Sequence, residues 1–238
     1  MGAGFVAGAT GYTGREVVRR LIECGARAVA HVRPDSPRLE EWTARFTALG
    51  ASVDRTPWDA AALRDTLTRL GPDVVFGLLG TTRARGRQVG RTGPLETYET
   101  VDYGLSALLL QATVAAAPGA KFVYLSSIGV REGSGNQYLL ARWRFEQELK
   151  ASGLRFVIAR PSLITGPDRD ENRPAERVAA AVGDAVLAVA GALGAARLRQ
   201  RYRSTTSSIL AGALVDLGLD PAVVNLTVES EDLRPVRR

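Results

Sequence analysis

The chain opens with an apolar run that passes directly into a glycine-rich turn and then into a helical pattern. Residues 3–8 read "AGFVAG", and they lead into "GATGYTG", which spans residues 8–14. After the turn, apolar side chains recur at the spacing of a helix that packs on one side, at Val17, Val18, Leu21 and Ile22. The opening of the chain therefore predicts a buried strand, a tight turn and a helix.

The three glycines of this turn each meet a separate need of a bound dinucleotide. Gly8 permits the tight turn, Gly11 lets the backbone approach a pyrophosphate, and Gly14 lets helix and strand pack closely. The N-terminus of the helix adds unpaired N–H groups and the positive end of a dipole. The sequence therefore predicts a dinucleotide site, which also includes Thr10, Tyr12 and Thr13.

Strand-like and helix-like segments alternate through most of the chain. Strands are predicted at 3–8, 26–32, 51–55, 73–80, 121–127 and 155–161. Helices are predicted at 13–24, 38–49, 59–70, 97–117 and 138–152. This alternation is typical of an α/β fold with a doubly wound parallel sheet, the Rossmann fold.

Two parts of one domain follow from this pattern. Residues 1–161 form the dinucleotide-binding core. Residues 162–238 form a smaller C-terminal part that covers the substrate and completes the same domain, with a helix at 205–217 and a short strand at 222–228.

Composition excludes several classes of function. The 238 residues include one cysteine, Cys24, and one histidine, His31, so we expect no disulfide framework and no metal cluster of these residues. The net charge is +6, but lysine occurs only at Lys121 and Lys150 and the arginines are spread along the chain, so no nucleic-acid partner is expected. The N-terminus shows no signal-peptide pattern, and the expected location is cytoplasmic.

Two alanine-rich stretches have alternative interpretations. Residues 179–196 have about the length of a membrane span, but Asp184 within them would cost about 2.5–3.5 kcal/mol on insertion. We therefore expect no membrane span here, but a buried or pocket-lining helix, whose apolar character suggests a small hydrophobic substrate, with a contact to a membrane surface as the alternative. Residues 105–117 fit either a homodimer face or a helix that covers the sheet.

The residues after the second predicted strand, "HVRPDS", indicate which dinucleotide binds. An acidic side chain here would accept hydrogen bonds from the ribose 2′-hydroxyl, whereas an arginine would neutralise a 2′-phosphate. Arg33 holds this position and Arg15 lies in the first turn of the preceding helix, so NADP(H) is favoured over NAD(H), with Asp35 leaving NAD(H) as the alternative. Asp59, after the third strand, fits two roles equally: an acceptor for the adenine amino group, or a helix N-cap.

Hydroxyl, phenol and guanidinium groups follow the fifth predicted strand. The stretch "LSSIGV" (125–130) ends this strand, and "YLLAR" (138–142) begins the next helix. Tyr138 and Arg142 stand at i and i+4, so both can point at one ligand on the sheet edge. These residues resemble the catalytic core of the short-chain dehydrogenase/reductase superfamily, a serine with Tyr-x-x-x-Lys, and "GATGYTG" resembles its atypical, NAD(P)H-binding branch.

Within that branch the chain resembles the oxidoreductases similar to the Tat-interacting protein. The resemblance covers most of residues 4–178 and is carried by "GLLGTTR" (77–83), "VD" (101–102), "LSSIG" (125–129), "YLLAR" (138–142) and "RPSLITGPDRDENRPAE" (160–176). It implies that Tyr138 is the acid/base and that Ser127 orients the same substrate oxygen, whereas Ser126 points the other way along the strand. It also implies that the cofactor is lined by Gly80, Thr81 and Thr82 and, at the nicotinamide face, by Pro161, Leu163 and Ile164.

Arg142 departs from the pattern, because the superfamily has lysine there. An arginine still supplies positive charge to favour tyrosinate and can donate to the nicotinamide ribose, but its planar fork is larger. Either Arg142 has taken over the role of the lysine, which we favour, or the site has lost turnover.

The function predicted from the sequence is an NADP(H)-dependent oxidoreductase that reduces a carbonyl or conjugated group on a small hydrophobic molecule. The alternatives are a non-catalytic regulator that senses NADP(H), and a quinone or flavin reductase, epimerase or dehydratase on the same fold.

Overall fold

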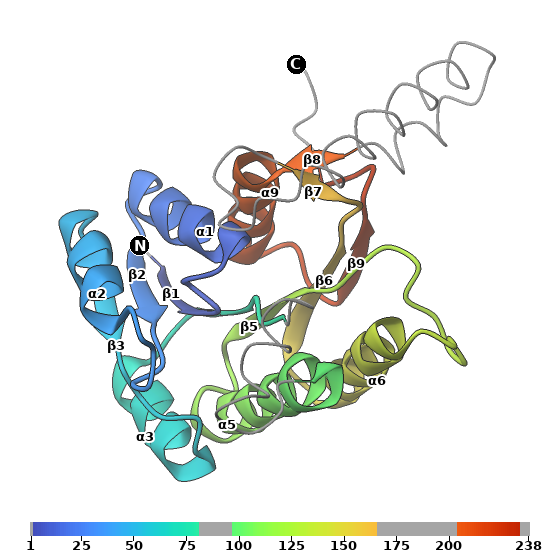
Figure 1. Ribbon diagram of the computed structural model, residues 1–238, viewed down its shortest axis with the longest axis horizontal. Helices are drawn as coiled ribbons and strands as arrows, with labels where there is room; N and C mark the ends of the chain where they lie inside the picture. Colours follow the sequence, from blue (N-terminus) through green and yellow to red (C-terminus); the bar gives the residue numbers. More distant parts are fainter. Residues whose placement is uncertain (1, 81–96, 166–203, 234–238) are drawn as a thin grey trace.

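A computed structural model describes residues 2–80, 97–165 and 204–233 of the chain. Its centre is a sheet of seven parallel strands in the order β3-β2-β1-β4-β5-β6-β9 (Figure 1). The strands are β1 (Ala3–Ala7), β2 (Arg27–His31), β3 (Ser52–Asp54), β4 (Val74–Gly77), β5 (Lys121–Leu125), β6 (Arg155–Arg160) and β9 (Leu226–Glu229). The predicted doubly wound α/β fold is confirmed.

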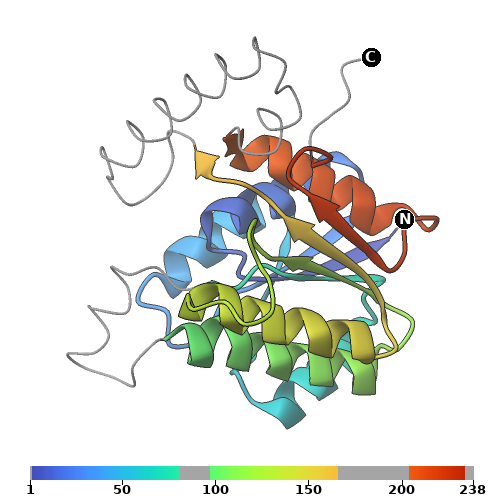
Figure 2. The ribbon, with the colours of Figure 1, turned by 90° about the vertical axis from the view of Figure 1, so that its right-hand side faces the viewer.

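Helices cover both faces of this sheet (Figure 2). One face packs against α1 (Tyr12–Glu23), α2 (Leu39–Ala48) and α9 (Ser207–Leu219). The other face packs against α3 (Ala60–Leu70), α5 (Ser106–Ala116) and α6 (Gln137–Ala151). Because a strand alternates its side chains, Val6 of β1 enters the first core and Phe5 the second. Strands buried on both faces explain why these segments read as continuous apolar runs.

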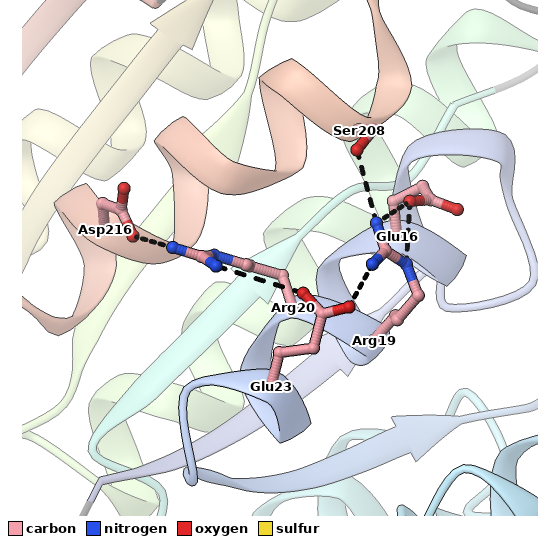
Figure 3. Close-up of polar contacts among 6 residues, drawn as sticks. All are labelled: Glu16, Arg19, Arg20, Glu23, Ser208 and Asp216. Carbon is pink, nitrogen blue, oxygen red and sulfur yellow. Dashed lines mark hydrogen bonds and ion pairs between the residues drawn. The ribbon is translucent and has the colours of Figure 1, made fainter. Parts of the chain in front are cut away.

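The helices α1 and α9 lie side by side although they are far apart in the sequence (Figure 3). Their contact is apolar inside and polar at the surface. The Arg19 Nη2 atom donates to Ser208 Oγ at 3.3 Å, and Arg20 Nη2 pairs with Asp216 Oδ1 at 3.4 Å. The C-terminal segment thus belongs to the fold itself, with α9 covering one face and β9 extending the sheet beside β6.

The predicted helix at 97–117 has two parts in the structure. It begins as a π-helix, η1 (Tyr98–Leu105), and continues as α5. Thr97 caps η1 by accepting from the Thr100 N–H at 3.1 Å, while the Thr100 Oγ1 atom accepts from the Thr97 N–H at 2.9 Å. π-helical segments are rare and frequently occur at functional sites. Here η1 carries the buried Asp102.

A two-stranded ladder stands apart from the main sheet. It pairs β7 (Ile164–Thr165) with β8 (Thr205–Thr206) in parallel. The alanine-rich stretch at 179–196 lies outside the described residues, so its predicted place beside the substrate stays a prediction. None of the helices within the described ranges is long and apolar enough to cross a membrane.

Candidate active site

The glycine turn between β1 and α1 has the geometry that its sequence predicts. Gly8 has a φ of +83°, and a Cβ atom there would lie 2.6 Å from the carbonyl oxygen of Leu78. A Cβ on Gly14 would lie 2.1 Å from the carbonyl oxygen of Gly8, so only glycine lets α1 pack this closely on the end of β1. Gly11 N–H donates to the same oxygen at 3.0 Å. Within the described residues no side chain caps α1, whose first N–H groups suit an anion.

A cleft opens beside this turn, at the carboxyl edge of the parallel strands. Doubly wound sheets bind their ligands at this edge, where the strand order reverses between β1 and β4. The cleft is lined by Gly8, Thr10, Gly11, His31, Val32, Arg33, Ser36, Trp58, Leu78, Leu79, Gly80, Val101 and Leu105. Gly8, Thr10, Gly11, Arg33 and Gly80 are thus brought together as the sequence predicted. No carboxylate occurs among the lining residues in the described ranges.

Arg33 follows β2 and forms part of the cleft wall. Its side chain is 30% exposed, and its Nε atom lies 3.6 Å from Oδ1 of the 74% exposed Asp35. Arg15 lies on the α1 side of the same edge, with its guanidinium carbon 6.0 Å from the Tyr12 ring centre and 5.6 Å from the Trp42 ring centre. Arg33 therefore lines the cleft, whereas Asp35 is not among its described lining residues.

Asp59 adopts the second of its two predicted roles. Its Oδ1 atom accepts from the Ala62 N–H at 2.9 Å and so caps α3. The neighbouring Trp58 lines the cleft instead. Sequence reasoning missed Trp58, although it stands directly before a capping aspartate after a short strand, a position from which a side chain can reach the carboxyl edge of the sheet.

His31 is a second wall residue that sequence reasoning set aside. It ends β2, is almost fully buried, and its Nε2 atom lies 2.8 Å from the carbonyl oxygen of Thr56. Its ring meets the Trp58 ring edge-on at a centroid distance of 4.8 Å. Burial lowers the pKa of His31 below its ordinary value and outweighs the Thr56 carbonyl and the Asp54 carboxylate, which both raise it. A neutral imidazole therefore supports the tryptophan.

The two serines after β5 have different surroundings. Ser126 is buried, and its Oγ atom donates to Glu146 Oε1 at 2.6 Å. Ser127 is partly exposed, and its Oγ atom donates to the neighbouring carbonyl of Ile128 at 3.3 Å. A weak local hydrogen bond of this kind leaves the Ser127 hydroxyl able to turn toward a ligand, whereas the Ser126 hydroxyl is held by a buried carboxylate.

Tyr138 lies at the start of α6, where the side chain of Asn136 accepts from its N–H at 3.0 Å. Its ring meets the Tyr98 ring of η1 edge-on at a centroid distance of 5.3 Å. On the same helix face, the guanidinium carbon of Arg142 lies 4.7 Å from the Tyr138 ring centre. The predicted pairing of Tyr138 and Arg142 at i and i+4 is therefore present in the structure.

The Arg142 guanidinium is buried and forms an ion pair that the sequence did not predict. Its Nη2 atom lies 2.8 Å from Oδ1 of Asp102, and the two side chains are 5% and 0% exposed. Nη2 also donates to the Leu79 carbonyl at 3.3 Å, while Nη1 donates to the carbonyl of Leu125 and to the Tyr124 hydroxyl. Burial lowers the pKa of Arg142, but Tyr138, Tyr124 and Asp102 raise it by more, so the group stays charged.

Gly80 lies against this ion pair. A Cβ atom on Gly80 would lie 3.1 Å from Arg142 Nη2 and 3.6 Å from Asp102 Oδ1. The ends of β4 and β5, the π-helix η1 and α6 all meet at this point. One guanidinium thus joins the cleft wall to the helix that carries Tyr138.

The remaining predicted residues lie after β6 and β4. Pro161 is buried and its carbonyl accepts from the Ile128 N–H at 3.0 Å, while Leu163 is 42% exposed and Ile164 begins β7. The Tyr12 hydroxyl donates to the Thr165 carbonyl at 3.2 Å, which joins the glycine turn to β7. Thr13 is buried in α1. Thr81 and Thr82 lie outside the described residues.

A family model described as NAD(P)H-binding matches residues 8–203. The chain belongs to this NAD(P)H-binding family. It is an oxidoreductase with the fold of the short-chain dehydrogenases/reductases, in agreement with the atypical branch that the motifs resemble. The glycine turn fits the cofactor of this family, because a side chain at Gly8 or Gly14 would collide with the backbone that forms the cradle.

Relatives of this NAD(P)H-binding chain are found among fungal and bacterial proteins. It is 32% identical over 178 residues to the mitochondrial protein fmp52 of Aspergillus niger, covering 72% of this chain and 70% of that one. It is 32% identical over 184 residues to an oxidoreductase of Streptomyces coelicolor, covering 68% of this chain and 72% of that oxidoreductase. It is 30% identical over 168 residues to the ceramide reductase of Caulobacter vibrioides, covering 70% of this chain and 47% of the reductase.

Solved structures share the fold at lower identity. UDP-glucose 4-epimerase of Thermotoga maritima superposes with a TM-score of 0.63 at 17% identity, over 94% of this chain and 75% of the epimerase. An oxidoreductase of the short-chain dehydrogenase/reductase family from Burkholderia thailandensis superposes with a TM-score of 0.62 at 19% identity, over 96% of this chain and 90% of the oxidoreductase. Because epimerases and reductases share this fold, the fold alone does not select the reaction.

Proposed function

We propose that this oxidoreductase prefers NADP(H) to NAD(H) and reduces a carbonyl or conjugated group on a small hydrophobic molecule, with Tyr138 as the acid/base. The observation that carries the proposal is the Arg142 guanidinium, 4.7 Å from the Tyr138 ring centre. A charged guanidinium over the ring favours the phenolate, which is the form that Tyr138 reaches after giving its proton to a substrate oxygen. The bound nicotinamide supplies the hydride. The Ser127 Oγ atom orients the same substrate oxygen.

Arg142 acts in this proposal chiefly by its charge. Both of its Nη atoms already donate to groups of the protein, at Asp102, Leu79, Leu125 and Tyr124, while its buried Nε atom has no hydrogen-bond partner among the described residues. A lysine has one compact ammonium, whereas the planar fork of an arginine can hold several fixed acceptors at once. This arrangement supports retained activity with arginine in place of lysine, because the cation still lies against the acid/base.

The preference for NADP(H) is supported by the charge of the cleft wall. Arg33 lines the cleft, and the described lining residues include no carboxylate to accept from a ribose 2′-hydroxyl. Asp35 is largely exposed and lies beside Arg33. A 2′-phosphate would therefore meet a cation, and the free 2′-hydroxyl of NAD(H) would lack its usual acceptor.

The names of two relatives support a hydrophobic substrate. One is the ceramide reductase of Caulobacter vibrioides, and another is a divinyl chlorophyllide a 8-vinyl-reductase of Oryza sativa, 34% identical over 167 residues. The chain spans 47% and 38% of these two proteins. The exposed Leu163 would lie on the substrate side of the nicotinamide.

Calorimetric titration with NADPH and NADH tests the cofactor proposal. The wild-type chain should bind NADPH more tightly, and Arg33→Ala should remove most of the difference. Arg64→Ala is the matched control, because Arg64 is an exposed arginine of α3 that pairs with Asp65 at 3.0 Å. Equal affinity of the wild type for both nucleotides would contradict the preference.

Turnover tests the role of Tyr138. NADPH oxidation with a panel of aldehydes, ketones, enones, quinones and flavins should be lost in Tyr138→Phe for the carbonyl substrates. Tyr103→Phe is the control, since its hydroxyl donates to Glu148 away from the cleft, at 3.1 Å. Quinone or flavin reduction that survives Tyr138→Phe would favour hydride transfer without a proton donor. Tight nucleotide binding without turnover on any substrate would favour the regulator.

Two further assignments stay predictions. Residues 162–238 would cover the substrate, and the location would be cytoplasmic. Of the two interpretations of residues 105–117, the sheet-covering helix is present in the structure as α5, and a homodimer stays a prediction. The fungal relatives carry the word mitochondrial in their names, so cell fractionation of a tagged chain is the direct test of location.

A further inference from the structure

The cleft wall combines polar and apolar groups. It includes the backbone of the glycine turn, the side chains of Thr10, Arg33 and Ser36, and the apolar side chains of Trp58, Leu79, Val101 and Leu105. If the glycine turn holds the pyrophosphate and Arg33 the ribose, as proposed above, the apolar side chains are left to receive the base of the nucleotide.

The Trp58 ring packs against buried rings. The His31 ring meets it edge-on at a centroid distance of 4.8 Å, and the Phe5 ring packs against His31 at a centroid distance of 5.7 Å. The His31 Nε2 atom is fixed by the Thr56 carbonyl at 2.8 Å. Since Phe5 and His31 are buried and Trp58 is partly exposed, this column of rings ends at the cleft.

Several acceptors near Trp58 have partners inside the protein. The Asp59 Oδ1 atom caps α3, and Oδ1 of the buried Asp54 accepts from the Thr56 N–H at 3.1 Å. The Thr56 carbonyl is used by His31, and its hydroxyl lies 2.8 Å from that of Thr66. Within the described ranges, the lining residues of the cleft include Trp58 and several aliphatic side chains but no carboxylate, and their side-chain hydroxyls are those of Thr10 and Ser36.

We propose that Trp58, supported by His31, recognises the base of the cofactor by stacking, and that the site does not read the exocyclic amino group of adenine. A flat aromatic surface accepts the π-face of any purine, because stacking needs no particular donor or acceptor. The hypoxanthine analogue of NADPH, which lacks that amino group, should then bind as well as NADPH itself.

Calorimetry with three reduced ligands tests this proposal. The ligands are NADPH, its hypoxanthine analogue and nicotinamide mononucleotide, which has no adenosine. The wild type should bind the first two within about twofold. Trp58→Leu should weaken both by about 5- to 150-fold, the range measured for losing one base–aromatic stack, and Trp58→Phe should restore most of the loss. The affinity for the mononucleotide should not change in either variant.

Two controls separate stacking from other effects. Trp143→Leu removes a partly buried tryptophan of α6 that does not line the cleft, and it should bind NADPH as the wild type does. Arg33→Ala should change the ratio of NADPH to NADH affinity, whereas Trp58→Leu should weaken NADPH and NADH by the same factor. A failure of the 2′-phosphate assignment and a failure of the stacking assignment therefore give different results.

Either of two outcomes would overturn the proposal. One is a wild-type affinity for the hypoxanthine analogue at least about tenfold weaker than for NADPH, since the amino group would then be read by a hydrogen bond. The other is a Trp58→Leu variant that melts as the wild type does and still binds NADPH with unchanged affinity.

Discussion

The ion pair between Asp102 and Arg142 should contribute far more to stability than a second ion pair between the same two helices. Both pairs join η1 to α6. The Asp102–Arg142 pair is 2.8 Å long with side chains that are 0% and 5% exposed, whereas the Glu99–Arg144 pair is 2.6 Å long with side chains that are 59% and 42% exposed. Distance is nearly the same, so the comparison isolates the effect of burial.

The expected magnitudes follow from what each substitution leaves behind. Arg142→Met leaves the Asp102 carboxylate without its cation in a site that water does not reach, which costs about 3–5 kcal/mol. Asp102→Asn leaves a charged guanidinium with carbonyl and hydroxyl acceptors only. The double variant Asp102→Asn/Arg142→Met buries no charge at these positions. Its loss in free energy of unfolding should therefore be smaller than the sum of the two single losses by about 2–3 kcal/mol.

Urea unfolding followed by circular dichroism measures this double-mutant cycle. The parallel cycle with Glu99→Gln and Arg144→Met should give a coupling free energy within about 1 kcal/mol of zero, because water screens an exposed pair. Adding 1 M NaCl should reduce the surface coupling and leave the buried coupling nearly unchanged. Coupling free energies of equal size for the two pairs would refute the argument from burial.

Three other substitutions test separate parts of the site. Gly14→Ala should lower the free energy of unfolding by about 1–3 kcal/mol and weaken NADPH binding, because its Cβ would lie 2.1 Å from a carbonyl oxygen. Gly119→Ala is the control, since a Cβ there would meet open space. Equal melting temperatures and NADPH affinities of the two variants would contradict the close-packing role of Gly14. The free energy of unfolding should fall as the pH drops from 7 toward 5.5, because the unfolded chain takes up a proton on His31 near pH 6.5 while burial lowers the pKa of His31 in the folded state. In urea titrations, His31→Gln should lose this part of the pH dependence. An unchanged slope of the free energy of unfolding against pH would contradict the prediction. Ser126→Ala should destabilise the chain by about 1–3 kcal/mol with little effect on kcat, because it removes a donor to the buried Glu146. Ser127→Ala should instead lower kcat and leave the melting temperature unchanged. The reverse pattern would exchange the roles of the two serines.

The parts of the site that the sequence predicts are those set by local geometry. The glycine turn is one example, because the space around Gly8 and Gly14 is determined within a few residues of chain. The contact of Tyr138 with Arg142 is another, since i and i+4 share a face of any α-helix. The parallel sheet covered on both faces likewise follows from the alternation of strands and helices, because each parallel connection carries a helix across one face of the sheet.

The parts that the sequence did not predict depend on contacts between distant segments. Asp102 and Arg142 are forty residues apart, and neither residue alone signals the other. Likewise, nothing local indicates that His31 at the end of β2 will meet Trp58 after β3, because that contact requires both strands to be placed in the sheet. Asp59 was ambiguous for a related reason, since a capping role is local and a ligand contact is not.

The pairing of α1 with α9 has a consequence for how the protein folds during synthesis. The glycine turn and α1 leave the ribosome first, and α1 can pack on β1 and β2 early, but its neighbour α9 comes from residues 207–219 and the sheet gains its last strand only at residues 226–229. A chain stopped after β6 would lack both the helix that packs beside α1 and the strand that pairs with β6. The surroundings of the glycine turn are therefore completed only when nearly the whole chain has been made.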